Sequence, residues 1–205
     1  GVMTLVQEHR SPTLDEMAVT FTLIGEFRNM LLFSALLTGL LLLCRQWRQA
    51  LFAGGTLLCT ALANTATKNF FARVRPEVLT DPLTSYSMPS GHASGAFALF
   101  LTLGVLAGRG QPPRMRLTWL LLACLPALSI ALSRVYLGAH WPTDVLAGAM
   151  LAACVCAASL WLNQRQTPLN AMPFKVWWLI LPALLALFSF FALRHLPPAM
   201  LRYAY

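Results

Sequence analysis

Residues 29–44 read NMLLFSALLTGLLLLC and carry no charged side chain. An α-helix of this length spans about 24 Å, close to the ~30 Å hydrocarbon core of a bilayer. Comparable apolar segments follow at about 50–67, 92–108, 116–133, 143–163 and 175–193. This pattern predicts an all-α fold, a polytopic transmembrane bundle of about six spanning helices.

The composition also indicates an integral membrane protein. Hydrophobic residues make up 58% of the chain and charged residues only 11%, whereas about a quarter of a soluble domain is charged. The formal net charge is +8, but the basic residues are scattered between apolar segments. A nucleic-acid site would gather them on one solvated face, so we expect no nucleic-acid partner.

The first 28 residues are more polar and amphipathic. Ser11 to Glu16 reads SPTLDE, which supplies a hydroxyl cap, a proline in the first turn and acids near the positive end of the helix dipole. Apolar residues then recur at helical spacing up to Ile24. We expect an N-terminal helix that lies at the membrane surface or is only partly inserted.

The links between the apolar segments predict the orientation of the chain. Links 45–49, 109–116 and 164–175 contain arginine or lysine and no acid. The positive-inside rule places these links in the cytoplasm. All seven acids then fall on the outer side, namely Glu8, Asp15, Glu16, Glu26, Glu77, Asp81 and Asp144.

Three polar clusters interrupt the apolar pattern, and the predicted topology brings them to the outer face. They are KNFFARVRP at 68–76, PSGH at 89–92 and SRVYLGAHWPTD at 133–144. Their fixed cations are Lys68, Arg75 and Arg134. Guanidinium forks and an ammonium suit the oxygens of a phosphate, and the free amides of a helix start bind anions. Ser90 and Gly91 precede such a start, and we expect Gly91 to let the backbone approach closely.

The two histidines of these clusters predict chemistry as well as binding. His140 and Asp144 are four residues apart, and a carboxylate on Nδ1–H would leave Nε2 as nucleophile or base. His92 lies in another cluster and could protonate a departing oxygen. Such a pair fits phosphoryl transfer through a covalent phosphohistidine. Arg73, two residues before Arg75, has no assigned position in these patterns, and we interpret it as an anchor to lipid headgroups.

The three clusters resemble the signature of the type 2 phosphatidic acid phosphatase superfamily of membrane lipid phosphatases. Their patterns read K-x-x-x-x-x-x-R-P, P-S-G-H and S-R-x-x-x-x-x-H-x-x-x-D. The resemblance implies that Lys68, Arg75, Arg134, Ser90 and the Gly91 amide bind the phosphate. It also implies that His140 is the nucleophile, His92 the general acid and Asp144 the partner that orients His140. It implies no metal and no other cofactor, and the sequence offers no cluster of carboxylates for a metal.

The same resemblance predicts a metal-independent phosphatase. The substrate would be a lipid phosphate monoester or diphosphate, such as undecaprenyl diphosphate, phosphatidylglycerol phosphate or phosphatidic acid. We expect a bacterial inner-membrane protein with its active site on the periplasmic face. Two alternatives remain open: an oxidoreductase like the vanadate-dependent haloperoxidases, whose site is similar because vanadate mimics phosphate, and a lipid-phosphate binder or transporter without turnover.

We expect a single membrane domain over residues 1–205. Residues 1–28 form its amphipathic segment, 29–163 its catalytic core, and 164–205 a C-terminal apolar helix and tail. The sequence begins with Gly1 where a methionine would be usual. We therefore expect that the chain could be part of a longer protein or could work with another membrane domain.

Overall fold

The computed structural model describes residues 1–79 and 83–204, and this part of the chain is helical throughout, without strands. Asp81, one of the acids expected on the outer side, lies outside the described residues. The helices are α1 (Val2–Glu8), α2 (Pro12–Gly25), α3 (Phe27–Leu43), α4 (Trp47–Phe71), α5 (Gly91–Gly108), α6 (Pro113–Tyr136), α7 (Pro142–Gln164) and α8 (Phe174–Arg202).

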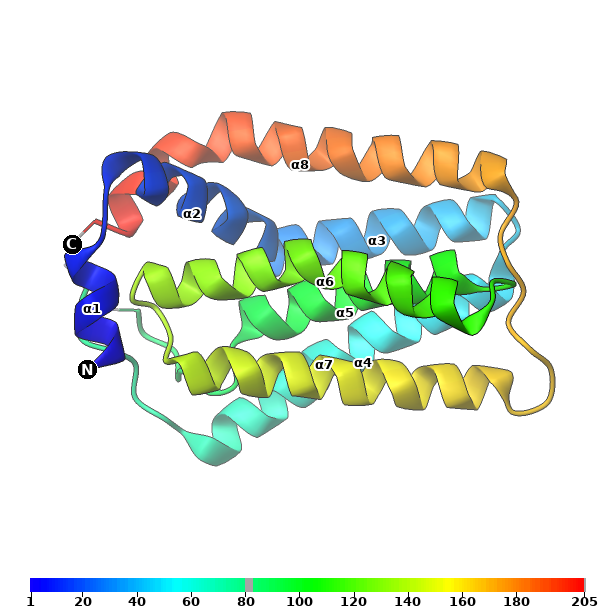
Figure 1. Ribbon diagram of the computed structural model, residues 1–205, viewed down its shortest axis with the longest axis horizontal. Helices are drawn as coiled ribbons and strands as arrows, with labels where there is room; N and C mark the ends of the chain where they lie inside the picture. The colour runs from blue at the N-terminus through cyan, green and yellow to red at the C-terminus, as the bar shows by residue number, and fades with distance from the viewer. Residues whose placement is uncertain (80–82, 205) are drawn as a thin grey trace.

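The helices form one elongated bundle, in which α3 to α8 run along the long axis (Figure 1). Five of the described helices are long and apolar enough to cross a membrane, and α2 and α3, bent by 56° at their junction, qualify together as a sixth span. The six predicted apolar segments all lie on these helices, so the predicted fold class is confirmed. The chain is an integral membrane protein.

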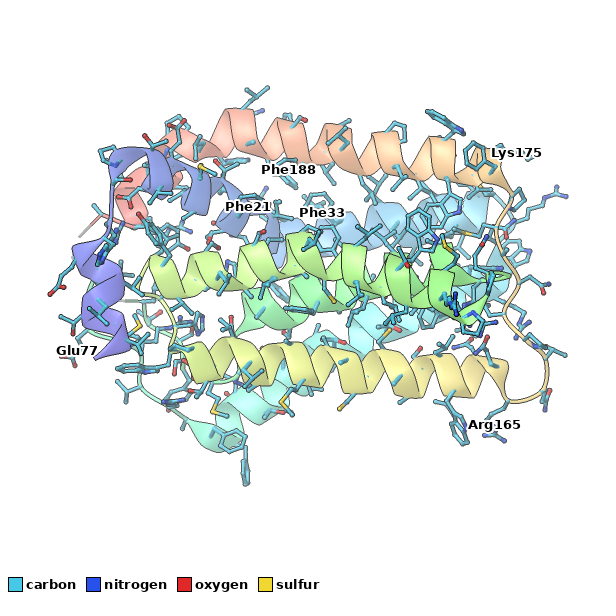
Figure 2. All side chains as sticks on the ribbon, in the orientation of Figure 1. Phe21, Phe33, Glu77, Arg165, Lys175 and Phe188 are labelled. Carbon is cyan, nitrogen blue, oxygen red and sulfur yellow. The ribbon has the colours of Figure 1, made fainter. Side chains whose placement is uncertain are left out.

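The predicted N-terminal helix is present as α2, and it packs onto the bundle. Ser11 caps it, since its Oγ accepts a hydrogen bond from the amide of Leu14 at 3.3 Å. The inner face of α2 is buried, including Val19 and Leu23, and it packs against α6 and α8. Phe21 lies with Phe33 and Phe188 in the layer between α8 and the helices beneath it (Figure 2).

Helix α5 is at the centre, in contact with α2, α3, α4, α6 and α7. Small residues let its neighbours approach closely. A Cβ at Gly148 of α7 would lie 2.7 Å from the carbonyl oxygen of Ser90, and one at Gly104 would lie 2.9 Å from Cβ of Ala123 on α6. Glycine at such positions is typical of membrane helix interfaces, where close backbone contact stabilises packing. The start of α5 is thereby fixed against α7.

The two ends of the bundle differ in charge. Arg165 and Lys175 lie at one end, and Glu77 lies at the other, beside α1 (Figure 2). At the basic end Arg48 donates hydrogen bonds to the carbonyls of Asn163, Thr167 and Pro168, which fixes the link between α7 and α8. The separation of charges agrees with the links used to predict the topology. The direction of insertion in the membrane stays a prediction.

Candidate active site

The three polar clusters meet at the end of the bundle that carries α1. Helix α4 ends before Ala72, whose φ of 45° turns the chain into an extended link. Helix α5 begins under the cap of Ser90, whose Oγ accepts from the amide of Ala93 at 3.3 Å. The amide of Ser90 donates to the carbonyl oxygen of Asp144 at 3.0 Å. This bond joins the second cluster directly to the third.

A cavity of about 640 Å³ opens beside the clusters. Its polar end is lined by Lys68, Arg75, His92 and His140, and also by Gly91. From there it runs between α3 and α4 over apolar residues, among them Phe27, Met30, Leu31, Ala35, Leu57, Leu58 and Ala61. The site is therefore a cationic, two-histidine pocket that continues into an apolar groove.

Arg75 and His140 are in direct contact in this pocket. Nη1 of Arg75 lies 2.8 Å from Nε2 of His140 and also donates to the carbonyl oxygen of Ala139 at 2.8 Å. A guanidinium can only donate, so Nε2 accepts and the ring proton is on Nδ1. The rest of the Arg75 guanidinium is held by Ser85, through its carbonyl oxygen at 2.7 Å and its Oγ at 2.8 Å.

The charges around His140 favour a neutral imidazole and a cationic Arg75. Burial lowers the pKa of His140, and the neighbouring Arg134, Arg75 and Lys68 lower it further, while Asp144 opposes them. Burial also lowers the pKa of Arg75 to about 10, so that side chain is still charged at neutral pH. A neutral His140 beside a charged Arg75 keeps a lone pair on Nε2, which a nucleophile requires.

Asp144 is fully buried at the start of α7, but it is not hydrogen-bonded to His140 as the sequence suggested. Oδ2 of Asp144 lies 3.7 Å from Nδ1 of His140, which is beyond hydrogen-bond distance. The same oxygen accepts from the backbone amide of Trp141 at 2.8 Å. Within residues 1–79 and 83–204, Nδ1 of His140 has no hydrogen-bond partner. The pair is close enough for a small shift to form the bond.

Our interpretation of Arg73 as a headgroup anchor was wrong. Nη1 of Arg73 lies 2.9 Å from Oδ1 of Asp144 and 2.7 Å from Oγ1 of Thr143. Its Cζ lies 5.7 Å from the ring centroid of Trp141. The indole Nε1 of Trp141 in turn donates to the carbonyl oxygen of Val74 at 3.1 Å. Arg73 therefore neutralises the buried carboxylate and ties the first cluster to the third.

The remaining predicted residues, His92, Arg134 and Ser90, differ in whether they line the cavity. His92 is on the first turn of α5 and lines the cavity, and its Nε2 has no hydrogen-bond partner in the described part of the chain. Arg134 is buried near the end of α6, where its Nη1 donates to the hydroxyl of Tyr203 at 2.6 Å. Ser90 is also buried, and neither it nor Arg134 is among the residues that line the cavity.

The expected close approach of the Gly91 backbone to a phosphate stays a prediction. A Cβ at Gly91 would lie 3.5 Å from Oδ1 of Asn64, which is ordinary contact. The tight position is Gly25 at the end of α2, where a Cβ would lie 2.9 Å from Cδ2 of His92. Helix α2 therefore covers His92 closely.

Two further polar residues, Asn64 and Ser94, lie in the cavity wall. Asn64 is buried, lines the cavity and donates from Nδ2 to Oγ of Ser94 at 3.0 Å. It lies four residues before Lys68, so the two share a face of α4, and this spacing could have revealed it. Ser94 also lines the cavity, and its Oγ donates to the Gly91 carbonyl oxygen at 3.2 Å.

A metal centre has no visible ligand set. Within residues 1–79 and 83–204, no group of three or more His, Cys, Asp or Glu side chains is placed to hold an ion. The groups that converge are instead cations and imidazoles, which bind anions. The prediction of a metal-independent site stays open to experiment.

The fold and the site together define a class, a polytopic membrane protein with a cationic, two-histidine pocket at one end of its helices. Residues 49–168 match the family model of the PAP2 superfamily. That segment is more than half of the chain and contains all three clusters. The chain belongs to the PAP2 superfamily.

Comparison with individual proteins agrees with this assignment. The chain is 39% identical over 95 residues to an undecaprenyl-diphosphatase of Sulfolobus acidocaldarius, covering 44% of this chain and 40% of that one. It is 35% identical over 127 residues to a decaprenylphosphoryl-5-phosphoribose phosphatase of Mycobacterium tuberculosis, covering 59% of this chain and 65% of that one. The chain thus spans about two fifths of the length of the Sulfolobus protein.

The fold also matches a solved structure. A transmembrane PAP2 type phosphatidylglycerolphosphate phosphatase from Bacillus subtilis superposes with a TM-score of 0.70. The match covers 81% of this chain and 84% of that one, at 24% identity. The likeness extends beyond the segment matched by the family model.

Proposed function

We propose that this chain is an integral-membrane lipid phosphatase that hydrolyses a lipid phosphate monoester or diphosphate through a phosphohistidine. The observation that carries the proposal is the shape of the cavity. Its cationic, two-histidine end continues directly into an apolar groove between α3 and α4. A molecule with a phosphate head and a hydrocarbon tail matches both parts.

The groove is suited to a lipid that enters from the side. Along α4 it extends from Gly54 to Lys68, which is about 21 Å at 1.5 Å per residue. Leu31 of α3 and Leu58 of α4 line it and are also 51% and 62% exposed. Their outer surfaces would face the bilayer, so a tail could pass between α3 and α4 while its headgroup reaches Arg75.

The first chemical step is attack on phosphorus by Nε2 of His140. The N–P bond forms as the bond from phosphorus to the leaving oxygen breaks, and His92 donates a proton to that oxygen. Lys68, Arg75 and Arg134 stabilise the charge on the transferring group. Binding of the phosphate replaces the contact between Arg75 and His140, which frees Nε2.

The second step regenerates the enzyme. A water attacks phosphorus, the O–P bond forms as the N–P bond breaks, and His92 takes the proton from the water. A small shift of the His140 ring would let Asp144, 3.7 Å from Nδ1, accept a hydrogen bond from Nδ1–H during both steps. The products are the dephosphorylated lipid and inorganic phosphate. His92 ends the cycle protonated, as it began.

The relatives guide the choice of substrates. By their names they act on a prenyl diphosphate, a decaprenyl-linked phosphoribose phosphate and a phosphatidylglycerol phosphate. We propose a lipid phosphate of this kind, presented from the outer leaflet of a bacterial inner membrane, with no nucleic-acid partner.

The test is phosphate release by purified protein in detergent. The panel contains undecaprenyl diphosphate, phosphatidylglycerol phosphate and phosphatidic acid, each with and without a metal chelator. We expect release from at least one lipid and no loss with chelator. Binding without release would favour a binder or transporter, and halide oxidation by vanadate-loaded protein without release would favour the haloperoxidase alternative.

A further inference from the structure

The end of α8 reaches the phosphate site, although it lies outside the segment 49–168 that matches the family model. Nη1 of Arg134 donates to the hydroxyl of Tyr203 at 2.6 Å, and Cζ of Arg134 lies 5.3 Å from the centroid of the same ring. Both residues are 2% exposed. Tyr203 is therefore a buried, neutral partner for a cation that the phosphate site needs.

Tyr203 is itself held in place from several sides. Its ring belongs to a buried cluster with Val19 and Leu23 of α2 and Leu137. Its carbonyl oxygen accepts from Nη2 of Arg10 at 2.9 Å. Next to it, Arg202 pairs with Glu26 at 3.2 Å. The hydroxyl thus has a fixed position relative to the end of α6.

Arg134 is also tied to the nucleophile through its backbone. Its carbonyl oxygen accepts from the amides of Ala139 and His140, at 3.0 and 3.2 Å. The side chain of Arg134 also helps to lower the pKa of His140. The guanidinium therefore lies within electrostatic range of the imidazole that would attack phosphorus.

The hydrogen bonds of Arg134 leave one edge of the guanidinium for an anion. Nη1 is occupied by Tyr203, whereas Nε is buried and has no hydrogen-bond partner among the residues that the structure describes. A guanidinium binds a phosphate through two parallel N–H groups, and Nε and Nη2 form such a pair on the edge away from Nη1. A phosphate bound at that edge would accept a hydrogen bond from the buried Nε and so satisfy it.

We propose that Tyr203 is a positioning residue of the phosphate site, which holds Nη1 of Arg134 so that the Nε and Nη2 edge meets the phosphate. The inference rests on the proposed function, because it assigns Arg134 to phosphate. It makes the end of α8 part of the active site. The contacts of Tyr203 with Arg10, Val19 and Leu23 would then support the active site as well as the packing, because they fix the position of the tyrosine.

The experiment measures the affinity for orthovanadate, a phosphate analogue, from the vanadate-induced rise in unfolding temperature. Tyr203→Phe keeps the ring and removes only the hydroxyl. We expect about tenfold weaker vanadate affinity, since a hydrogen bond to a charged group is lost. The matched control is Tyr136→Phe, which removes a hydroxyl that bonds Asp15 and the amide of Ser11 instead. Its vanadate affinity should equal that of the wild type.

A double variant separates positioning from a general loss of structure. In the Arg134→Lys background, Tyr203→Phe should have no further effect on vanadate affinity, because the group it orients is gone. Equal affinities for wild type and Tyr203→Phe would overturn this inference, and so would an equal loss in Tyr136→Phe. Failure of the wild type to bind vanadate would instead count against the proposed function itself.

Discussion

At the scale of single residues, Asp144 shows how a buried charge is kept. Its side chain is fully buried, and an isolated carboxylate there would be strongly disfavoured. Arg73 and the amide of Trp141 each bind one of its oxygens. The carboxylate can therefore stay ionised and lie 3.7 Å from the ring that it would orient.

Arg73→Gln tests this arrangement. The variant leaves the buried carboxylate with one donor fewer, so we expect kcat to fall roughly tenfold with little change in KM, because substrate is not touched. Arg73→Lys should recover part of the loss. Arg114→Gln, which removes the same charge at the other end of the bundle, is the control. Unchanged kcat in Arg73→Gln would show that Asp144 needs no counterion.

The lowered pKa of His140 predicts how stability depends on pH. The unfolded chain binds a proton near pH 6.5, whereas the folded protein keeps His140 neutral to lower pH. The unfolded state therefore binds more protons below pH 6.5, and stability falls as the pH drops through that value. When the pH is lowered from 7.5 to 5.5, the unfolding temperature of the wild type should fall by more than that of His140→Ala. Identical slopes would contradict a depressed pKa.

At the scale of elements, α4 carries both Lys68, the proposed phosphate ligand, and one wall of the proposed tail groove. Lys68 and Asn64 line the same cavity as Ala61 and Leu57, so one helix would align the head and the tail of a lipid. The groove reaches Gly54 and Thr38 at its far end. The length of the groove would set how many carbons of a lipid tail it can hold.

Ala61→Phe tests the groove. The ring would fill its middle, so KM for a long-chain lipid phosphate should rise about tenfold, whereas turnover of a short water-soluble phosphate ester should stay near wild type. Ala66→Phe places the same ring at an exposed position of α4 that does not line the cavity. It should change neither the KM for the lipid nor the turnover of the short ester. Equal effects of the two variants on the lipid would mean that the tail binds elsewhere.

The helices themselves were predictable because each is a long apolar segment, and the clusters because charge is rare between such segments. The helix ends were predicted less well, because α4 continues to Phe71 and α6 to Tyr136, beyond the predicted ends at 67 and 133. The partners of Arg73 and Arg134 were not predictable. Asp144 and Tyr203 lie about 70 residues away along the chain, and no local spacing connects residues that only folding brings together.

At the scale of the whole molecule, the account depends on which end faces outward. Glu77 and the site lie at one end of the bundle, and Arg165 and Lys175 lie at the other (Figure 2). The positive-inside rule places the basic end in the cytoplasm. The lipid phosphate would then be cleaved on the outer side.

Cysteine labelling in intact cells tests that orientation. In a background where the five native cysteines are replaced, Glu77→Cys should react with a membrane-impermeant maleimide added outside. Arg165→Cys should react only after the membrane is permeabilised. The reverse pattern would place the site in the cytoplasm.

The central claim is that His140 is the nucleophile of a lipid phosphatase, and phosphate release by purified His140→Ala tests it most directly. The substrate is the best lipid of the panel, and His9→Ala is the control, because His9 is exposed and its Nδ1 hydrogen-bonds the backbone carbonyl of Leu5. We expect His9→Ala to match the wild type and His140→Ala to fold but release no phosphate above background. Normal release by His140→Ala would contradict the covalent mechanism.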